Sequence, residues 1–212
     1  MGNAIEWREK AIEAWAREQI GKPTGDIYAE DLSHIEKIEL PEADLHSIED
    51  LRHMRGLKII ILFRNHISDL TPIADIKSIE RIVMWGNDVR DVSPVAGLTN
   101  MFELCFSGND IYDVSSLKNL TGVQYLSMHD NHISDISAFS GMDLRKPYLN
   151  SNKFSDISPL SGMKNMRELY INDNLVSDLS PLAGLKELEI LDARDNPVTD
   201  WSPVSFVTDI RK

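Results

Sequence analysis

Residues 166–187, MRELYINDNLVSDLSPLAGLKE, decide the fold of this chain, because their pattern recurs along most of the sequence. Apolar residues stand eight, five and three positions before Asn174, and Asp178 stands four positions after it. The asparagine recurs at steps of 22, 22, 22, 21, 22 and 22 residues. Its seven positions are Asn65, Asn87, Asn109, Asn131, Asn152, Asn174 and Asn196. A fixed period of this length predicts a solenoid in which each repeat forms one coil.

The repeated residues are expected to build the scaffold. The apolar positions of each coil point inward and stack on the coils before and after, which forms one continuous core. The asparagine lies where the strand turns, and its amide can donate to and accept from the backbone of adjoining turns. The aspartate precedes a short turn whose free backbone N–H groups can donate to its carboxylate. We therefore assign both polar columns to structure rather than to metal binding or acid–base chemistry.

Two coils depart from the rule. A degenerate first coil contains Ile35, Ile38 and Leu40 and has Ala43 in the asparagine position, which brings the expected total to about eight coils. Coil six is one residue short, and Pro147 replaces the central aliphatic residue of its strand. Because proline cannot donate to a strand ladder, we expect a bulge or a kink around residues 143–149.

The exposed ends of a stacked core need caps. Residues 1–34 are predicted to form a helical N-terminal cap, and residues 35–212 the solenoid, the two making one structural unit. Within the cap, Ala4 to Gln19 read as a helix that Gly21 and Pro23 end. A second short helix is expected through residues 29–32. At the other end, the apolar side chains of residues 200–212, DWSPVSFVTDIRK, could seal the last coil or mark the junction with a following domain.

Composition and motifs limit the function. A net charge of −12 argues against nucleic acid as the partner. No run of about 18 apolar residues is present, so no membrane span is predicted. Cys105 is the single cysteine, and its strand supplies no base arranged to activate it. The phosphate-binding and hydrolase motifs are missing as well, so we expect neither an enzyme nor a bound cofactor.

Four residues that follow the asparagine in successive coils could line one rim of the solenoid: His66, Asp88, Asp110 and His132. Histidine and aspartate are both metal ligands. Neighbouring coils lie about 4.8 Å apart, however, which is too far for all four side chains to reach one ion. A solvated rim is therefore expected, and no metal site is predicted.

The repeats resemble those of a known family. The segments MRELYINDNLVSDLSPLAGL and LKELEILDARDNPVTDWSPVSFV are similar to the 22-residue repeats of bacterial internalin-type leucine-rich repeat proteins. The segment AIEAWAREQIGKPTGDIYAEDL is similar to the helical cap that precedes such repeats. The resemblance implies an α/β fold, a right-handed solenoid with a parallel β-sheet on the concave face and short turns or 3-10 segments on the convex face.

The resemblance also implies a secreted or cell-surface bacterial protein that uses its concave face to bind a protein, such as a host or cell-surface protein. A glycan ranks behind a protein as the partner. Similar repeats occur in intracellular phosphatase-regulatory proteins, so a cytoplasmic regulatory scaffold is the alternative hypothesis.

Function should lie in the positions that vary between repeats. Side chains alternate faces along a strand, so the positions six, four and two before each asparagine point outward. Apolar patches and tyrosines at such positions favour recognition. The predicted partner-binding residues form an N-terminal group and a tyrosine-rich group: Ile59, Ile61, Phe63, Arg81, Val83 and Trp85, then Tyr125, His129, Tyr148, Asn150, Tyr170 and Asn172.

Each group has a simpler explanation that stays open. The cap could fold over the apolar group, or a homodimer could cover it, and the tyrosines could be ordinary exposed strand residues. The pairs Arg81–Glu103 and Lys146–Glu168 are expected to be solvated cross-strand ion pairs of small energetic value.

Overall fold

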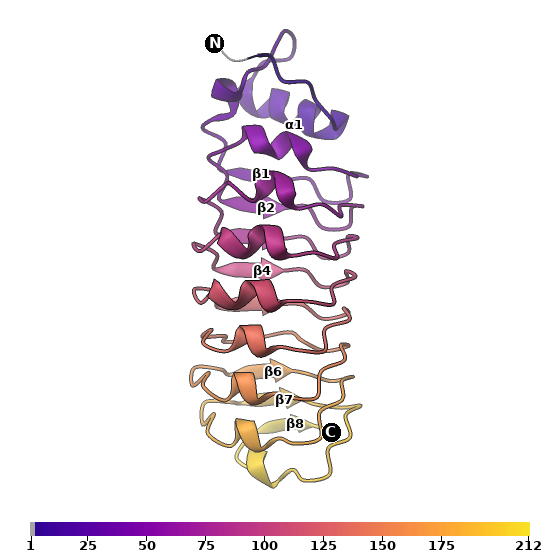
Figure 1. Ribbon diagram of the computed structural model, residues 1–212, viewed down its shortest axis with the longest axis vertical. Coiled ribbons are helices and arrows are strands. Elements are labelled where there is room, and N and C mark those ends of the chain that lie inside the picture. The colour runs from indigo at the N-terminus through magenta and orange to yellow at the C-terminus, as the bar shows by residue number, and fades with distance from the viewer. Residues whose placement is uncertain (1–2) are drawn as a thin grey trace.

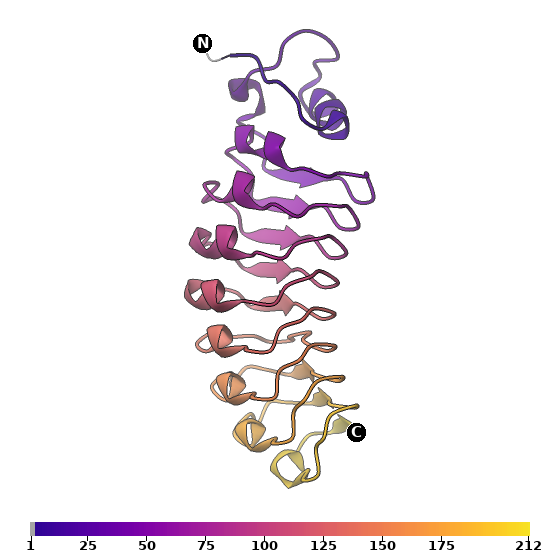
Figure 2. The same cartoon turned by 45° about the vertical axis from the view of Figure 1, so that its right-hand side comes forward.

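A computed structural model describes residues 3–212 as one column of stacked coils (Figure 1). In each regular coil a short strand leads into a turn, and a short 3-10 helix returns the chain on the opposite side. Figure 2 shows the row of short helices bowing outward, which leaves the sheet on the inner side of the curve. The architecture is the predicted leucine-rich repeat solenoid with a helical cap. Residues 1 and 2 of the predicted cap lie outside the described residues.

The strands pair in parallel, each with the same position of the next coil. Their bounds are β1 Lys37–Glu39, β2 Ile59–Ile61, β3 Arg81–Val83, β4 Glu103–Cys105, β5 Tyr125–Ser127, β6 Glu168–Tyr170, β7 Ile190–Asp192 and β8 Asp209–Arg211. The return segments are 3-10 helices at Ala29–Leu32, Glu49–His53, Thr71–Ile73, Ser93–Gly97, Ser115–Asn119, Ser137–Phe139, Ser158–Leu160, Ser180–Leu182 and Ser202–Val204. None of the helices described in residues 3–212 is long and apolar enough to cross a membrane.

The predicted core positions are buried. In the second coil, Leu57, Ile60 and Leu62 have no exposed surface, and equivalent residues continue this core from the cap to the last coils. Burying such side chains contributes about 1.5–3 kcal/mol each. The core is therefore a continuous apolar column, as the repeat predicts.

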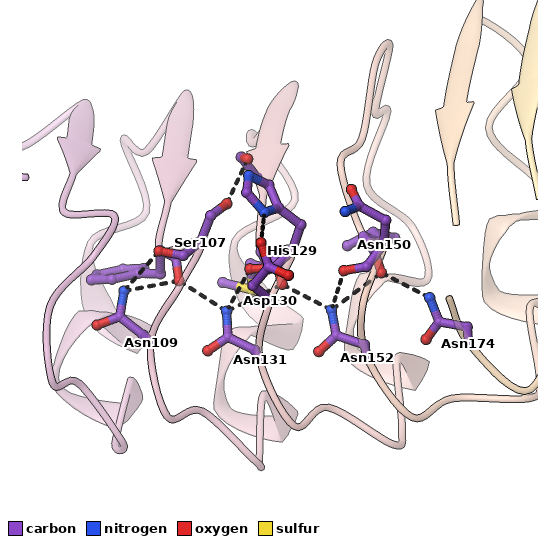
Figure 3. Close-up of polar contacts among 12 residues, drawn as sticks. Ser107, Asn109, His129, Asp130, Asn131, Asn150, Asn152 and Asn174 are labelled. Atoms are coloured by element: carbon purple, nitrogen blue, oxygen red, sulfur yellow. Dashed lines mark hydrogen bonds and ion pairs between the residues drawn. The ribbon is translucent and has the colours of Figure 1, made fainter. Parts of the chain in front are cut away.

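The asparagine column is a hydrogen-bond ladder (Figure 3). Asn109 accepts from the N–H of Val89 in the coil before at 2.9 Å and donates to the carbonyl of Met84 in that coil at 3.1 Å. It also donates to Phe106 of its own coil at 3.0 Å. Each such amide ties two coils together, so the structural assignment of this column is confirmed. Ala43 suits the first coil, because no earlier coil offers carbonyls for an amide to bind.

The aspartate column caps the 3-10 helices, as predicted. The carboxylate of Asp69 accepts the backbone N–H of Thr71 at 2.8 Å, and that of Asp156 accepts the N–H of Ser158 at 2.8 Å. In the first coil, Ser47 takes the same role and accepts from the N–H of Glu49. The column is thus a set of local turn caps.

Coil six breaks the sheet, as predicted from its proline. Strands β1–β5 form one sheet and β6–β8 another. Between them, Tyr148 makes only isolated bridges to Ser127 and Tyr170. Pro147 has no N–H to offer to the following strand. The gap between the arrows in Figure 3 marks this irregular coil.

The N-terminal cap differs from the prediction at its start. Helix α1 spans Lys10–Ile20 and does not begin at Ala4. The preceding segment is extended, because Ile5 donates to the carbonyl of Ile27, and the N–H groups of Arg8 and Glu9 donate to the carboxylate of Asp50. The second short helix, Ala29–Leu32, is confirmed as a 3-10 turn.

The C-terminal end contains a strand that the sequence pattern did not predict. Strand β8 pairs with β7, with Ile210 beside Leu191. Val204 and Val207 are buried beneath it. Residues 200–212 therefore pack onto the preceding coil.

Candidate recognition surface

The outward side chains of the strands and of the residue two positions beyond each strand form one surface, which we call the sheet face. The strand register places equivalent side chains in rows, such as Ile61 beside Val83 and Val83 beside Cys105. The predicted alternation is confirmed, since Ile60 is fully buried whereas Ile59 and Ile61 are half-buried. All twelve predicted binding residues occupy this face.

An aromatic pair dominates the N-terminal part of the sheet face. The rings of Phe63 and Trp85 stack with centroids 4.6 Å apart and planes 6° from parallel. The guanidinium of Arg64 lies over the Trp85 ring, 4.9 Å from its centroid. Ile61 and the nearly buried Val83 lie in the adjoining row. Stacked and partly buried rings are rigid, which lowers the entropy cost of binding through them.

A second aromatic pair lies in the C-terminal part of the face. Tyr148 and Tyr170 stack with centroids 4.8 Å apart, and the ammonium of Lys146 lies within 5.7 Å of both rings. Lys146 also pairs with Glu168 at 2.7 Å, as predicted, and the Tyr170 hydroxyl donates to Glu168 at 2.7 Å. This network raises the pKa of Lys146. Although burial favours protonated Glu168, the bonds from Lys146 and Tyr170 hold the pKa of Glu168 below its usual range.

Tyr125 does not join the tyrosine stack. Its ring meets Phe102 edge-on with centroids 5.1 Å apart, and both residues are more than 40% exposed. The three tyrosines of the predicted tyrosine-rich group are therefore one stacked pair and one separate residue. Phe102 was missed by the sequence analysis because it precedes its strand and so lies outside the three outward columns.

Small side chains hollow the centre of the sheet face, in coils four and five. Cys105, Ser107 and Ser127 form its floor, and the two serine hydroxyls are 2.8 Å apart in a mutual hydrogen bond. Trp85, His129 and Asp130 line this central hollow, whereas Tyr125 and Tyr148 line a second, smaller hollow that shares Cys105 and Ser127 with it. Burial raises the pKa of the Cys105 thiol, which keeps the floor uncharged at neutral pH.

The charged residues of the sheet face pair with one another. Arg81 contacts Glu103 at 2.8 Å, as predicted, and the buried carboxylate of Asp192 contacts Arg194 at 2.6 Å. The complete set is Lys37–Glu39, Arg81–Glu103, Lys146–Glu168, Arg194–Asp192 and Arg211–Asp209. Each cation is matched by an anion, so this face is formally neutral in a chain whose net charge is −12.

The rim beyond the asparagine column carries separate histidine–aspartate contacts. His66 lies 3.5 Å from Asp44 and 3.6 Å from Asp88, while His132 lies 3.6 Å from Asp110. The four predicted rim residues thus fall into two groups. Within residues 3–212, no three His, Cys, Asp or Glu side chains gather closely enough to hold a metal ion.

The residue before each asparagine has a backbone conformation that the sequence pattern did not reveal. It is left-handed in coil after coil, with φ of 54° at Arg64 and Asp130 and 53° at Ser151. In coils three and four the position is glycine, with φ of 67° at Gly86 and 62° at Gly108. A column that mixes Gly, Arg, Ser and Asp has no residue type in common, which explains why composition gave no signal.

Comparisons with known proteins agree with this architecture. The family model for leucine-rich repeats in two copies matches residues 148–184 and 164–206. The structure is similar to that of internalin C2 from Listeria monocytogenes, with a TM-score of 0.90 and 28% identity over 95% of this chain and 92% of that chain. It is also similar to the structure of internalin F from the same organism. That comparison gives a TM-score of 0.88 and 26% sequence identity over 95% of this chain and 62% of that chain.

A leucine-rich repeat protein of Leptospira interrogans shares the fold alone, with a TM-score of 0.73 and 19% identity over 84% of this chain and 54% of that chain. No curated protein sequence matches the chain. By its repeats and its fold, this is a leucine-rich repeat solenoid. Its structure is similar to those of the two Listeria internalins.

Proposed function

We propose that the chain is a non-catalytic recognition module that binds a protein partner through the sheet face. The observation that carries the proposal is the presence of two stacked aromatic pairs, Phe63–Trp85 and Tyr148–Tyr170, on one face of an acidic solenoid. Tryptophan and tyrosine are enriched among the residues that dominate binding energy at protein interfaces. The internalin-like fold supports an interaction module of this kind.

The geometry of the stacks favours a protein over a glycan. Sugars bind aromatic side chains mainly by lying on an open ring face. Here Phe63 covers one face of Trp85, and Tyr148 and Tyr170 cover one another. Arg64 and Lys146 lie over the rings as well. The ring surface, edges and hydroxyls that remain suit contact with the side chains and backbone of a protein.

The proposed location is outside the bacterial cell, either secreted or attached to the surface. The similarity to two Listeria internalins supports this location. A non-catalytic role is supported by the state of the single cysteine. Burial raises the pKa of the Cys105 thiol, which disfavours the nucleophilic thiolate at neutral pH.

Affinity capture with matched variants tests the proposal. The wild-type protein is immobilised, and the proteins that it retains from host-cell surface extracts and bacterial extracts are identified by mass spectrometry. The variant Trp85→Ala/Tyr148→Ala should lose the specific partner while its circular dichroism is unchanged. The control Tyr112→Ala removes an aromatic ring that is 60% exposed and lies away from the sheet face, and it should retain the partner. Retention by the double variant would disprove binding through this face.

A further inference from the structure

The central hollow differs from the rest of the sheet face because no large side chain occupies it. Its floor is Cys105, Ser107 and Ser127, and its volume is about 550 Å³. That volume lies within the range of about 300–1,000 Å³ that is typical of ligand pockets. The hollow therefore has room for at least one large side chain from another molecule.

Two glycines keep the hollow open on the side of the asparagine column. Gly86 and Gly108 both line it. A Cβ atom on Gly108 would come no closer than 3.6 Å to its nearest neighbour, the backbone nitrogen of Gly86. Arg64, Asp130 and Ser151 adopt the same left-handed conformation in other coils. Neither the backbone conformation nor a steric clash therefore requires glycine at position 108. The main effect of Gly108 is that no side chain from this position fills the hollow.

The chemistry of the hollow selects an uncharged occupant. The hydroxyls of Ser107 and Ser127 already bond to each other at 2.8 Å. The thiol of Cys105 stays protonated because burial raises its pKa. The nearby charges of Arg81 and Glu103 are paired at 2.8 Å. The Asp130 carboxylate, which lines the hollow, is already hydrogen-bonded to His129 at 2.7 Å. A charged group entering this space would lose its hydration, which costs free energy.

We propose that the central hollow receives one large uncharged apolar side chain, of the kind carried by tryptophan, phenylalanine or leucine, from the protein partner. This inference rests on the proposed function and names the chemistry of its anchor. The side chain would lie against the Trp85 ring and over the floor of Cys105, Ser107 and Ser127. An anchor of this kind, in a desolvated hollow at the centre of an interface, is where binding energy concentrates.

Indole, which is the ring of a tryptophan side chain, tests the hollow without knowledge of the partner. The protein is labelled with nitrogen-15, and amide chemical shifts are followed during titration. We expect saturable shifts centred on residues 105–108 and 127–129, with a dissociation constant on the order of 1 mM. Guanidinium serves as the charged control and should shift none of these amides saturably.

Matched variants at one repeat position make the test specific. Gly108→Asn places a side chain in the hollow, and asparagine tolerates left-handed backbone. Ser151→Asn introduces the same residue at the equivalent position of coil six, where φ is 53°, outside the hollow. Both variants should keep the wild-type circular dichroism. Gly108→Asn should weaken indole binding at least about tenfold, whereas Ser151→Asn should leave it unchanged.

The inference would be overturned if indole gave no saturable shifts, or if Gly108→Asn bound indole as tightly as wild type. It would also be overturned if guanidinium bound as well as indole, or if the same amides shifted with protein concentration alone. The last outcome would assign the hollow to a second copy of the chain. Failure here is separate from failure of the proposed function. If Trp85→Ala/Tyr148→Ala loses the partner but indole does not bind the wild-type protein, only the inference about the hollow is overturned. If the double variant still captures the partner, the proposed function is overturned, whether or not indole binds.

Discussion

Glu9 and Asp50 cap each other's segments across the junction between the N-terminal cap and the first coil. The carboxylate of Asp50, 1% exposed, accepts the N–H of Glu9 at 2.8 Å. The carboxylate of Glu9 in turn accepts the N–H groups of His46 and Ser47 at 3.0 and 2.9 Å. This reciprocal arrangement, rather than the helix alone, positions the cap on the solenoid.

Replacing Asp50 with alanine should therefore loosen the cap. Two backbone N–H groups, those of Arg8 and Glu9, would lose their acceptor, and a buried donor without a partner costs about 1–3 kcal/mol. We expect a loss of at least about 2 kcal/mol in urea unfolding and faster amide hydrogen exchange across residues 4–20. Glu49→Ala removes an exposed neighbour that pairs with Arg52 and should cost less than about 0.5 kcal/mol. Equal losses would refute the role of Asp50.

The asparagine ladder should be weaker at coil seven than at coil four. Asn109 both accepts and donates between coils, whereas the buried side-chain oxygen of Asn174 has no partner among the described residues. Asn109→Ala should therefore destabilise the protein by about 1 kcal/mol more than Asn174→Ala. Chemical denaturation of the two variants measures the difference. A larger loss for Asn174→Ala would contradict the hydrogen-bond geometry.

The sheet break at coil six can be repaired if proline causes it. Pro147→Val restores both an N–H donor and a branched aliphatic side chain at the centre of the strand. The variant should gain about 1 kcal/mol in unfolding free energy and one additional slowly exchanging amide, at residue 147. A loss of stability would show instead that the missing residue of this coil breaks the sheet, and that the proline accommodates the break.

The aspartate column should make stability depend on acid. Backbone N–H groups of Ser115, Ser158 and Ser202 hold the pKa values of Asp113, Asp156 and Asp200 below the ordinary 3.8. A carboxylate whose pKa is lower in the folded than in the unfolded protein stabilises the fold at pH values above its unfolded pKa. This stabilisation is lost as the pH falls through the folded-state pKa. Asparagine can accept the same hydrogen bond but does not titrate. The variant with asparagine at all three positions should lose less stability than wild type as the pH falls below 3.8.

The repeat made most of the scaffold predictable. Leu57, Ile60 and Leu62 follow strand alternation, and the position of Asn65 fixes the turn, so local pattern and tertiary structure agree. The start of α1 was missed because Asp50, 41 residues away from Glu9, takes the amides that a longer helix would use. Strand β8 was missed because it lies 19 residues after β7 and so departs from the regular period of 22.

The candidate surface was predictable in position but not in detail. Strand alternation placed Trp85 and Tyr148 outward, because it depends only on spacing. It could not show that Tyr125 turns toward Phe102, since side-chain rotamers decide that contact. Nor could it show the central hollow, which depends on small residues from several coils and on the left-handed position that Gly108 occupies.

Cys105 provides the most direct test of the sheet face as the binding surface, because it is the only cysteine and lies at the centre of that face. Its alkylation by iodoacetamide is followed by mass spectrometry with and without saturating captured partner. A control protein carries Cys105→Ser and Tyr112→Cys, which moves the thiol to an exposed site away from the face. We predict that the partner slows alkylation of Cys105 at least about tenfold and leaves the control unchanged. Alkylation of Cys105 at the free rate in the saturated complex would contradict recognition through the sheet face.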